Sequence, residues 1–301
     1  MTQPKIGSRV KYLLCFLLLS ILSFDLVART IHTERSIYRN ITIVENNKKR
    51  CMRFETRRRA ISNQACLNLN DKDKLIFEYT QSLMAGLAYN PSPKKILIIG
   101  LGGGTLPMAF AKILPETEVV SVEIDPAVAK LAKKYFNYTE TDKIKTSIKD
   151  GRVYIKRAVK NQQKFDWIIL DAFNGDYIPE HLLTVEFLSE AKALLAPGGL
   201  LSANTFNSSK LYDYESVTYQ TVFSELQILP SSTKGNRIIF VCNCDKLAGQ
   251  FKHKQPIKAA LLPLGVDLDL LVGRLSGDIV WDTSVPPLTD QFSPANLLNQ
   301  D

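Results

Sequence analysis

Four acidic residues have the spacing and the surroundings that a binding or catalytic site needs: Glu123, Asp125, Asp150 and Asp171. The first two follow a run of glycines by about twenty residues, a distance at which an acidic side chain can bind two ribose hydroxyls. A carboxylate can also hold an amine and accept its proton. Each of the four could instead cap the N-terminus of a helix, a real alternative for Asp150. Together they favour a nucleoside site.

The glycine run lies in the stretch KKILIIGLGGGTLPMAFA at 94–111 and contains Gly100, Gly102, Gly103 and Gly104. The β-branched residues before it predict a buried parallel strand, and the glycines allow the backbone to approach a ligand closely. The loop has no phosphate-binding lysine and no clean dinucleotide fingerprint. An uncharged loop with acidic residues beyond it favours a nucleoside that carries a sulfonium, such as S-adenosylmethionine or its decarboxylated form, over NAD.

The elements that must position these residues alternate between strand and helix, which predicts a doubly wound α/β sheet. In such a sheet, ligands bind outside the carboxyl ends of the parallel strands, where the acidic residues stand. An antiparallel hairpin at 226–243 is expected to complete the sheet. The expected parallel strands are 96–99, 118–124, 144–148, 165–170 and 200–205, and the expected helices are 106–114, 126–135, 151–159, 185–195 and 212–223.

The part of the chain before the glycine run has a different pattern. Polar and apolar residues alternate over 36–70, which predicts short antiparallel strands that need to pack against the next unit for stability. A helix is expected over 71–88, and the prolines that follow it end the helix. We therefore expect a leader at 1–28, an N-terminal β-domain with its linking helix at 29–92, and a Rossmann-like nucleoside-binding transferase domain at 93–301.

The leader resembles a secretory signal peptide, because basic residues precede an apolar run at 12–24 and a small residue follows it. This run is shorter than the roughly 18 residues that a membrane-spanning helix needs, but an uncleaved anchor is an alternative. We expect export to the periplasm or the medium, or anchoring in a membrane through 12–27. If the leader is not functional, the protein is cytoplasmic.

Composition argues against several function classes. The net charge is +8, but the basic cluster at 48–59 is better explained as the solvated face of a hairpin than as a nucleic-acid site. The five cysteines and three histidines match no metal-site spacing, so neither a metal nor a nucleic-acid partner is expected. Cys51 and Cys66 either pair across a hairpin in an oxidising compartment or are buried thiols.

The chain resembles the spermidine synthase (polyamine aminopropyltransferase) family, and most of all its diverged bacterial members. The resemblance implies an α/β fold with a Rossmann-like, seven-stranded methyltransferase-type sheet preceded by a small antiparallel β-domain. It is carried by the glycine stretch at 94–111, VEID at 122–125, the Asp150-Gly151 pair, FDWIILDAF at 165–173 with IPEHLLT at 178–184, SNQACLNLND at 62–71 and PPLTDQFSPANLL at 286–298.

This resemblance implies an aminopropyl transfer from decarboxylated S-adenosylmethionine to a small-molecule amine in polyamine biosynthesis, carried out by a homo-oligomer. Gln64 would contact the nucleoside, Glu123 would hold the ribose hydroxyls and Asp150 would meet the adenine amine. Asp171 matches the catalytic aspartate that takes a proton from the attacking amine. The other positions expected at the nucleoside are Gly100, Gly102, Gly103, Gly104, Asp125 and Gly151.

The sequence departs from the family's pattern on the amine side of the site. Gly103 stands where typical members have an aspartate, and Asn174 replaces a second aspartate. The tyrosine-glutamine pair of the preceding helix is read here as Phe77-Glu78. Glu78, Asn174, Asp176 and Tyr177 are the candidate amine-binding residues.

Two other functions stay open from the sequence. An S-adenosylmethionine-dependent methyltransferase uses the same fold and a similar nucleoside site. A non-catalytic nucleoside-binding protein would keep the donor pocket without turnover.

Overall fold

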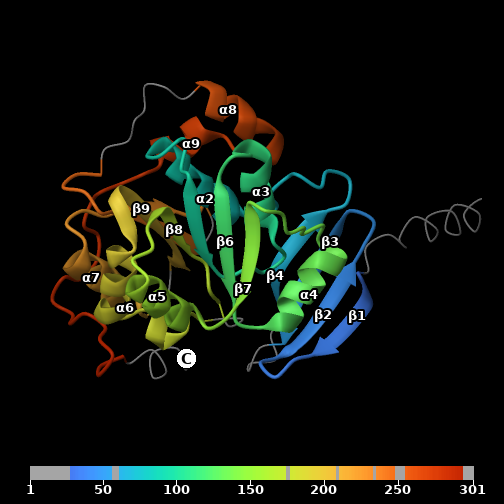
Figure 1. Ribbon diagram of the computed structural model, residues 1–301, viewed down its shortest axis with the longest axis horizontal. Helices are drawn as coiled ribbons and strands as arrows, with labels where there is room; N and C mark the ends of the chain where they lie inside the picture. Colours follow the sequence, from blue (N-terminus) through green and yellow to red (C-terminus); the bar gives the residue numbers. More distant parts are fainter. Residues whose placement is uncertain are drawn as a thin grey trace, which may run out of the picture.

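The computed structural model describes residues 28–55, 61–173, 177–207, 210–232, 235–247 and 255–293 (Figure 1). Several expectations therefore lie outside the described residues. They concern the leader at 1–27, the arginines at 57–59, Asn174 and Asp176, and the chain after 293. Within the described ranges, no helix is both long enough and apolar enough to cross a membrane.

A seven-stranded sheet forms the centre of the molecule, with the strand order β10-β11-β9-β8-β5-β6-β7. The strands from β5 to β9 run parallel, and β10 and β11 are antiparallel, as expected. The chain builds outwards from β5 in both directions, so the point where the order reverses lies between β5 and β8. The strands are β5 (Lys95–Ile99), β6 (Glu118–Glu123), β7 (Ile144–Ile148), β8 (Phe165–Leu170), β9 (Leu195–Phe206), β10 (Gln227–Pro230) and β11 (Asn236–Cys242).

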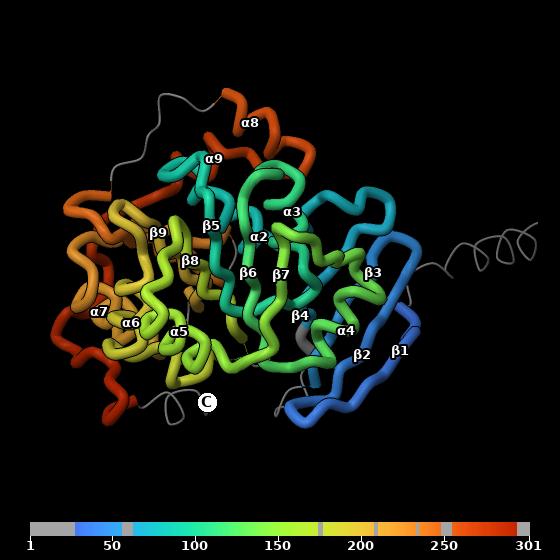
Figure 2. The backbone as a smooth tube through the Cα atoms, in the orientation of Figure 1, coloured from blue at the N-terminus to red at the C-terminus, as the bar shows by residue number. Residues whose placement is uncertain are grey.

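Helices cover both faces of this sheet, so the side chains on both sides of β5 are buried, and the strand is a continuous apolar run from Ile96 to Ile99. Ile96 and Ile98 pack on one face, whereas Leu97 and Ile99 pack on the other. The first face carries α3 (Thr105–Ile113), part of α4 (Pro126–Tyr135), α8 (Gln255–Leu261) and α9 (Leu268–Gly273), and the second carries α5 (Gly151–Lys160), α6 (Val185–Ala193) and α7 (Tyr212–Val222) (Figure 2).

A separate four-stranded antiparallel sheet precedes the large one, in the order β1-β2-β3-β4. Its apolar face, which includes Ile43 and Met52, packs against Leu131 of α4. This contact supplies the apolar partner that so small a sheet needs. Figure 1 shows the sheet beside α4, at the edge of the molecule. Its strands are β1 (Arg29–Arg35), β2 (Asn40–Glu45), β3 (Lys49–Glu55) and β4 (Ile61–Asn68).

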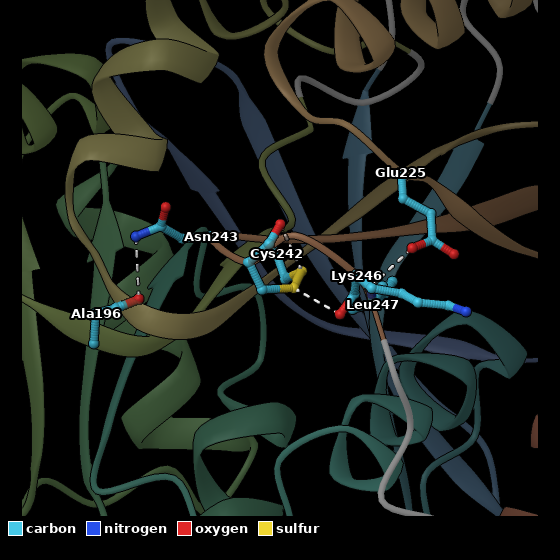
Figure 3. The surroundings of a disulfide bond; sticks show 7 residues. Ala196, Glu225, Cys242, Asn243, Lys246 and Leu247 are labelled. Atoms are coloured by element: carbon cyan, nitrogen blue, oxygen red, sulfur yellow. Dashed lines mark hydrogen bonds between the residues drawn. A yellow bond between two sulfur atoms is a disulfide. The ribbon is translucent and has the colours of Figure 1, made fainter.

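Two disulfide bonds are present in the described chain. Cys51 of β3 and Cys66 of β4 face each other directly in the sheet and are bonded, so these two cysteines pair and are not free thiols. Cys242 and Cys244 form a second bond, which the sequence pattern does not predict. Asn243 stands between them, and its side-chain amide donates to the carbonyl of Ala196 at 3.3 Å (Figure 3).

The helix expected over 71–88 is wrong in its first half. The regular helix is α2 (Glu78–Leu83), continued by a 3₁₀ helix at Met84–Ala88. The segment before it is not helical: the Lys74 N–H bonds to the Asp71 carbonyl at 3.3 Å in a turn, and the Leu75 N–H bonds to the Leu264 carbonyl at 3.0 Å. No element is predicted after β11, although 255–273 is rich in apolar residues, because Pro263 and Gly265 interrupt any regular helical spacing there.

Candidate functional site

A cavity of about 520 Å³ opens at the carboxyl ends of the parallel strands, where the strand order reverses. It is lined by many of the residues that the sequence singles out, and by residues of the small sheet and of the segment after β8. The predicted residues that line it are Gln64, Gly100, Gly102, Gly103, Glu123, Asp150, Gly151, Asp171 and Tyr177.

Two positions of the glycine loop have no room for a side chain, Gly100 beside the end of β8 and Gly103 beside β4. Gly100 has a φ of +111°, and a Cβ there would lie 2.3 Å from the carbonyl oxygen of Asp171. At Gly103 a Cβ would lie 2.8 Å from the Cβ of Ala65. An aspartate at position 103 would thus require Ala65 of β4 to move. The close packing of Ala65 against position 103 therefore favours the glycine found here over the aspartate of typical family members.

Glu123 is the last residue of β6, and its carboxylate is fixed by two backbone groups. It accepts hydrogen bonds from the N–H of Leu101 at 3.2 Å and from the N–H of Asp125 at 3.0 Å. Its side chain is buried, and this burial raises its pKa. An ionised carboxylate accepts up to about four hydrogen bonds, so each oxygen can still accept one from a ligand.

Asp125 lies two residues after Glu123 and does not line the cavity. Its carboxylate accepts from the N–H of Ala127 at 2.9 Å, as the N-cap of α4, and from the hydroxyl of Ser36 at 2.6 Å. The sequence predicts that Asp125 binds the nucleoside, but in the structure it caps α4. Gly104 is also outside the cavity lining: it precedes α3 with a φ of +73°, and a Cβ there would lie 2.6 Å from the ring of Tyr138.

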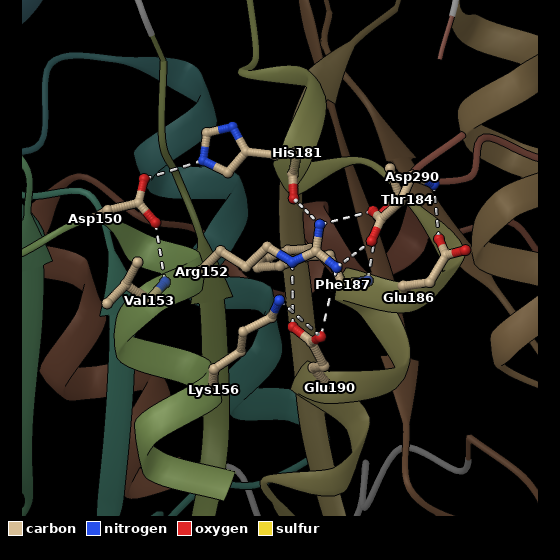
Figure 4. Close-up of polar contacts among 10 residues, drawn as sticks. All are labelled: Asp150, Arg152, Val153, Lys156, His181, Thr184, Glu186, Phe187, Glu190 and Asp290. Carbon is tan, nitrogen blue, oxygen red and sulfur yellow. Dashed lines mark hydrogen bonds and ion pairs between the residues drawn. The ribbon is translucent and has the colours of Figure 1, made fainter. Parts of the chain in front are cut away.

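Asp150 combines the two roles that the sequence leaves open. One oxygen caps α5 by accepting from the N–H of Val153 at 2.9 Å, and the other lies 3.1 Å from Nε2 of His181 (Figure 4). The carboxylate also lines the cavity. A carboxylate with this many lone pairs can cap the helix and still accept from a ligand amine.

The cavity wall that carries His181 is held from behind by Arg152. The guanidinium of Arg152 makes two hydrogen bonds of 2.7 Å to the carboxylate of Asp290 and also contacts Glu190 (Figure 4). Asp290 in turn accepts from the hydroxyl of Thr184 at 2.8 Å. The late segment around Asp290 is thereby attached to α5 and to the start of α6.

Asp171 directly follows β8 and is partly buried in the lining of the cavity. The carboxylate accepts hydrogen bonds from the side-chain amide of Asn204 at 2.8 Å and from the hydroxyl of Tyr79. Burial raises the pKa of Asp171 to about 7, although both hydrogen bonds oppose the rise. A carboxyl group that titrates near neutrality is suited to exchange a proton with a substrate.

The tyrosine that contacts Asp171 is Tyr79. The sequence pattern places the tyrosine of the family's tyrosine-glutamine pair at Phe77, two residues too early, so that assignment is wrong. Glu78 does not line the cavity: its carboxylate accepts from the hydroxyl of Ser231 at 2.7 Å and from the guanidinium of Arg274 at 3.3 Å. The apolar spacing of Tyr79 with Leu83 suggests a core position. The actual start of the helix at Glu78, several residues later than the pattern predicts, decides which side chain faces the cavity.

Other residues of the site give no clear signal in the sequence. Asn204 lies inside the apolar strand β9, and only its place in the sheet brings it to Asp171. Among the described residues, no group of three His, Cys, Asp or Glu side chains could hold a metal ion. The additional lining residues include Tyr38, Arg39, Phe54, Tyr79, Lys149 and His181.

Comparisons with known proteins agree with this geometry. The family model for the spermine/spermidine synthase domain matches residues 77–233. A polyamine aminopropyltransferase of Vibrio vulnificus (strain CMCP6) is 43% identical over 273 residues, which cover 89% of this chain and 91% of that protein.

Solved structures show the same fold. A probable spermidine synthase from Corynebacterium glutamicum has a TM-score of 0.63 at 22% identity, with 85% of this chain and 99% of that chain covered. A spermidine synthase in complex with the transition state analogue AdoDATO has a TM-score of 0.60 at 20% identity, with 86% of each chain covered.

Proposed function

The chain belongs to the spermine/spermidine synthase family, and we propose that it transfers an aminopropyl group from decarboxylated S-adenosylmethionine to an amine. The observation that carries this proposal is the carboxyl group of Asp171, whose pKa is raised to about 7 in the lining of a cavity that also contains Glu123 and Asp150. This puts a proton acceptor for the amine beside acceptors for a nucleoside.

The donor would be bound by carboxylates that backbone N–H groups already hold in one orientation. Glu123 has lone pairs left for the ribose hydroxyls, and the carboxylate of Asp150 can accept from the adenine amine. The bare backbone of the glycine loop allows the nucleoside to lie close to the strand ends. Decarboxylated S-adenosylmethionine is a co-substrate in this proposal, and the proposal requires no metal.

The chemical step needs a neutral amine nitrogen in line with the carbon next to the sulfonium. The nitrogen forms a bond to that carbon, and the carbon–sulfur bond breaks with its electron pair moving to sulfur. The products are a neutral methylthioadenosine and an alkylated amine, whose surplus proton goes to the Asp171 carboxylate. Because sulfonium is already a good leaving group, holding the two reactants in place supplies much of the rate.

The amine would lie near Asp171, between the aromatic side chains that line this end of the cavity. Tyr79 and Tyr177 belong to this lining, as does Phe173. The hydroxyl of Tyr79 donates a hydrogen bond to Asp171 and so keeps the carboxylate in one orientation. The lone pair of the amine nitrogen then stays available for attack. Tyr177 is therefore retained as a candidate amine-binding residue.

For location, we propose export or anchoring through residues 12–27. The Cys51–Cys66 and Cys242–Cys244 bonds support this, since disulfides persist in oxidising compartments. Fractionation of a protein tagged at its C-terminus tests the proposal, and recovery in the cytosol would contradict it. A homo-oligomer is proposed from the family resemblance, and sedimentation of the purified chain tests it.

Calorimetry with the two candidate donors tests the choice of reaction. We expect tighter binding of decarboxylated S-adenosylmethionine than of S-adenosylmethionine. A preference for the carboxylated donor would favour methyl transfer and contradict aminopropyl transfer. If the chain binds nucleosides without any turnover, Asp171→Asn will leave the affinity unchanged, as expected for a binding protein.

A further inference from the structure

A second, small cavity lies behind the wall of the large cavity that contains Asp171. Its volume is about 20 Å³, which is room for about one water molecule. Ile99 and Ala172 line both cavities, so the two are neighbours. The polar side chains in the lining of the small cavity belong to Asn204 and Thr205 of β9 and to Tyr219 of α7. A space of this size with polar groups around it suits a water molecule and is too small for an organic ligand.

Asn204 connects the small cavity to Asp171. Its side-chain amide donates to the carboxylate of Asp171 at 2.8 Å, while Asn204 itself lines the small cavity and not the large one. Asn204 is 3% exposed, and its Oδ1 has no hydrogen-bond partner in the part of the chain that the structure describes. A buried amide oxygen without a donor is costly to the fold. A donor in the small cavity would remove this cost.

Tyr219 supplies a hydroxyl to the same lining from α7. Its side chain is buried, and this burial raises the pKa of the hydroxyl, which therefore stays protonated at neutral pH and can donate. The charged groups that face Tyr219 are Glu215 of α7 and Arg237 of β11. A buried tyrosine hydroxyl usually has a hydrogen-bond partner. A water molecule in the small cavity can be that partner.

Thr205 is the third polar residue, and its hydroxyl is held in place by a buried ion pair. Oγ1 of Thr205 accepts from Nε of Arg237 at 2.9 Å and donates to the carboxylate of Glu215. The guanidinium of Arg237 is fixed in turn by the hydroxyl of Ser216 at 2.8 Å. A hydroxyl has two lone pairs, so that of Thr205 can accept one further hydrogen bond.

One water molecule would satisfy all three groups. It can accept from the hydroxyl of Tyr219 and donate to Oδ1 of Asn204 and to Oγ1 of Thr205, and three hydrogen bonds are the usual number for a buried water. A chain of donors then runs from Tyr219 through the water and the amide of Asn204 to the carboxylate of Asp171. Hydrogen bonds arranged in such a chain strengthen one another.

We propose that a single buried water in the small cavity joins Tyr219 to Asn204, and that Tyr219 is thereby a positioning residue for Asp171. The inference rests on the proposed function, in which Asp171 accepts the proton of the amine. The side chains that contact Asp171 directly are Tyr79 from α2 and Asn204 from β9. The water gives α7, which does not line the large cavity, an indirect part in the reaction.

High-resolution crystal structures and pH profiles of the wild type and of Tyr219→Phe test this proposal. In the wild type we expect a water molecule within hydrogen-bond distance of Oδ1 of Asn204, and in the variant we expect it to be lost or displaced. The acid limb of the kcat/KM profile should move to higher pH by about half a pH unit, because the donor chain that favours the carboxylate is shortened. Tyr214→Phe, on the same helix but outside both cavities, is the matched control and should leave the profile unchanged.

Addition of Tyr219→Phe to Asn204→Leu should cause no further shift, because the water acts on Asp171 only through Asn204. A wild-type cavity without water, shifts that add in the double variant, or a variant that is less stable but has an unmoved profile would each overturn the proposal. Denaturant unfolding as a function of pH reports the same titration without turnover. A bound water and a shifted titration in a protein that transfers no aminopropyl group would contradict the proposed function and leave the water site intact.

Discussion

Asn204 donates a hydrogen bond of 2.8 Å from its side-chain amide to Asp171, and its own amide oxygen is buried without a partner in the described chain. The bond joins β9 to the end of β8. An amide can donate to a carboxylate and, after rotation, accept from a carboxylic acid. Asn204 can therefore accompany Asp171 through both of its protonation states.

Asn204→Leu is expected to raise the pKa of Asp171 above its value of about 7, because the hydrogen bond to the carboxylate lowers that pKa. The acid limb of the kcat/KM profile should then move to higher pH, by about one pH unit. Asn70→Leu, at an exposed turn, serves as the control. An unshifted profile would show that Asn204 does not act on Asp171.

Asp171→Asn is expected to abolish turnover and to stabilise the fold. The folded-state pKa of about 7 lies above the ordinary 3.8, so between these values the folded protein binds more protons than the unfolded one. The stability of the wild type therefore falls as the pH rises through this range. The variant should gain on the order of 1–4 kcal/mol at pH 8, and less at pH 5. Denaturant unfolding at both pH values measures this, and equal gains would contradict the assigned pKa.

Arg152 and Asp290 should be energetically coupled, since their two hydrogen bonds attach the late segment to the wall that carries His181 (Figure 4). A double-mutant cycle with Arg152→Met and Asp290→Asn is expected to give a coupling of about 1–3 kcal/mol. The KM for the donor should also rise in each variant. Lys156→Met, whose amine is exposed and 3.8 Å from Glu190, should change little. A coupling near zero would show that the pair does not hold this wall.

The Cys51–Cys66 bond should stabilise the chain far more than the Cys242–Cys244 bond. The first closes a separation of 15 residues and the second one of 2, and the loop entropy that a disulfide removes grows with this length. Replacing both cysteines of the first pair by Ala should lower the free energy of unfolding by about 3 kcal/mol. Denaturation under oxidising conditions compares the two double variants. Equal losses would contradict the loop argument.

The sequence predicts the large sheet well, because its central strands β5, β6 and β8 are short apolar runs that end at a glycine or a carboxylate. Glu123, Asp150 and Asp171 can be assigned to one site from the sequence alone, since strand ends meet at one edge of a parallel sheet. The role of Asp125 differs from the prediction because a carboxylate before Pro126 serves equally well as a helix cap.

The site residues that no sequence pattern indicates depend on contacts between distant parts of the chain. Tyr79 faces Asp171 with the helix starting at Glu78, and the segment before this helix is bonded to a distant part of the chain, from the Leu75 N–H to the Leu264 carbonyl. Arg39 enters the cavity because Ser36 bonds to Asp125, 89 residues away. No local pattern contains this information.

Release of methylthioadenosine tests the central claim most directly. The purified full chain is incubated with decarboxylated S-adenosylmethionine and a panel of amines, with Asp171→Asn as the matched control. We predict methylthioadenosine and an alkylated amine in equal amounts with at least one amine, and no turnover by the variant. Absence of methylthioadenosine with every amine, from a wild-type protein that binds the donor, would contradict the account.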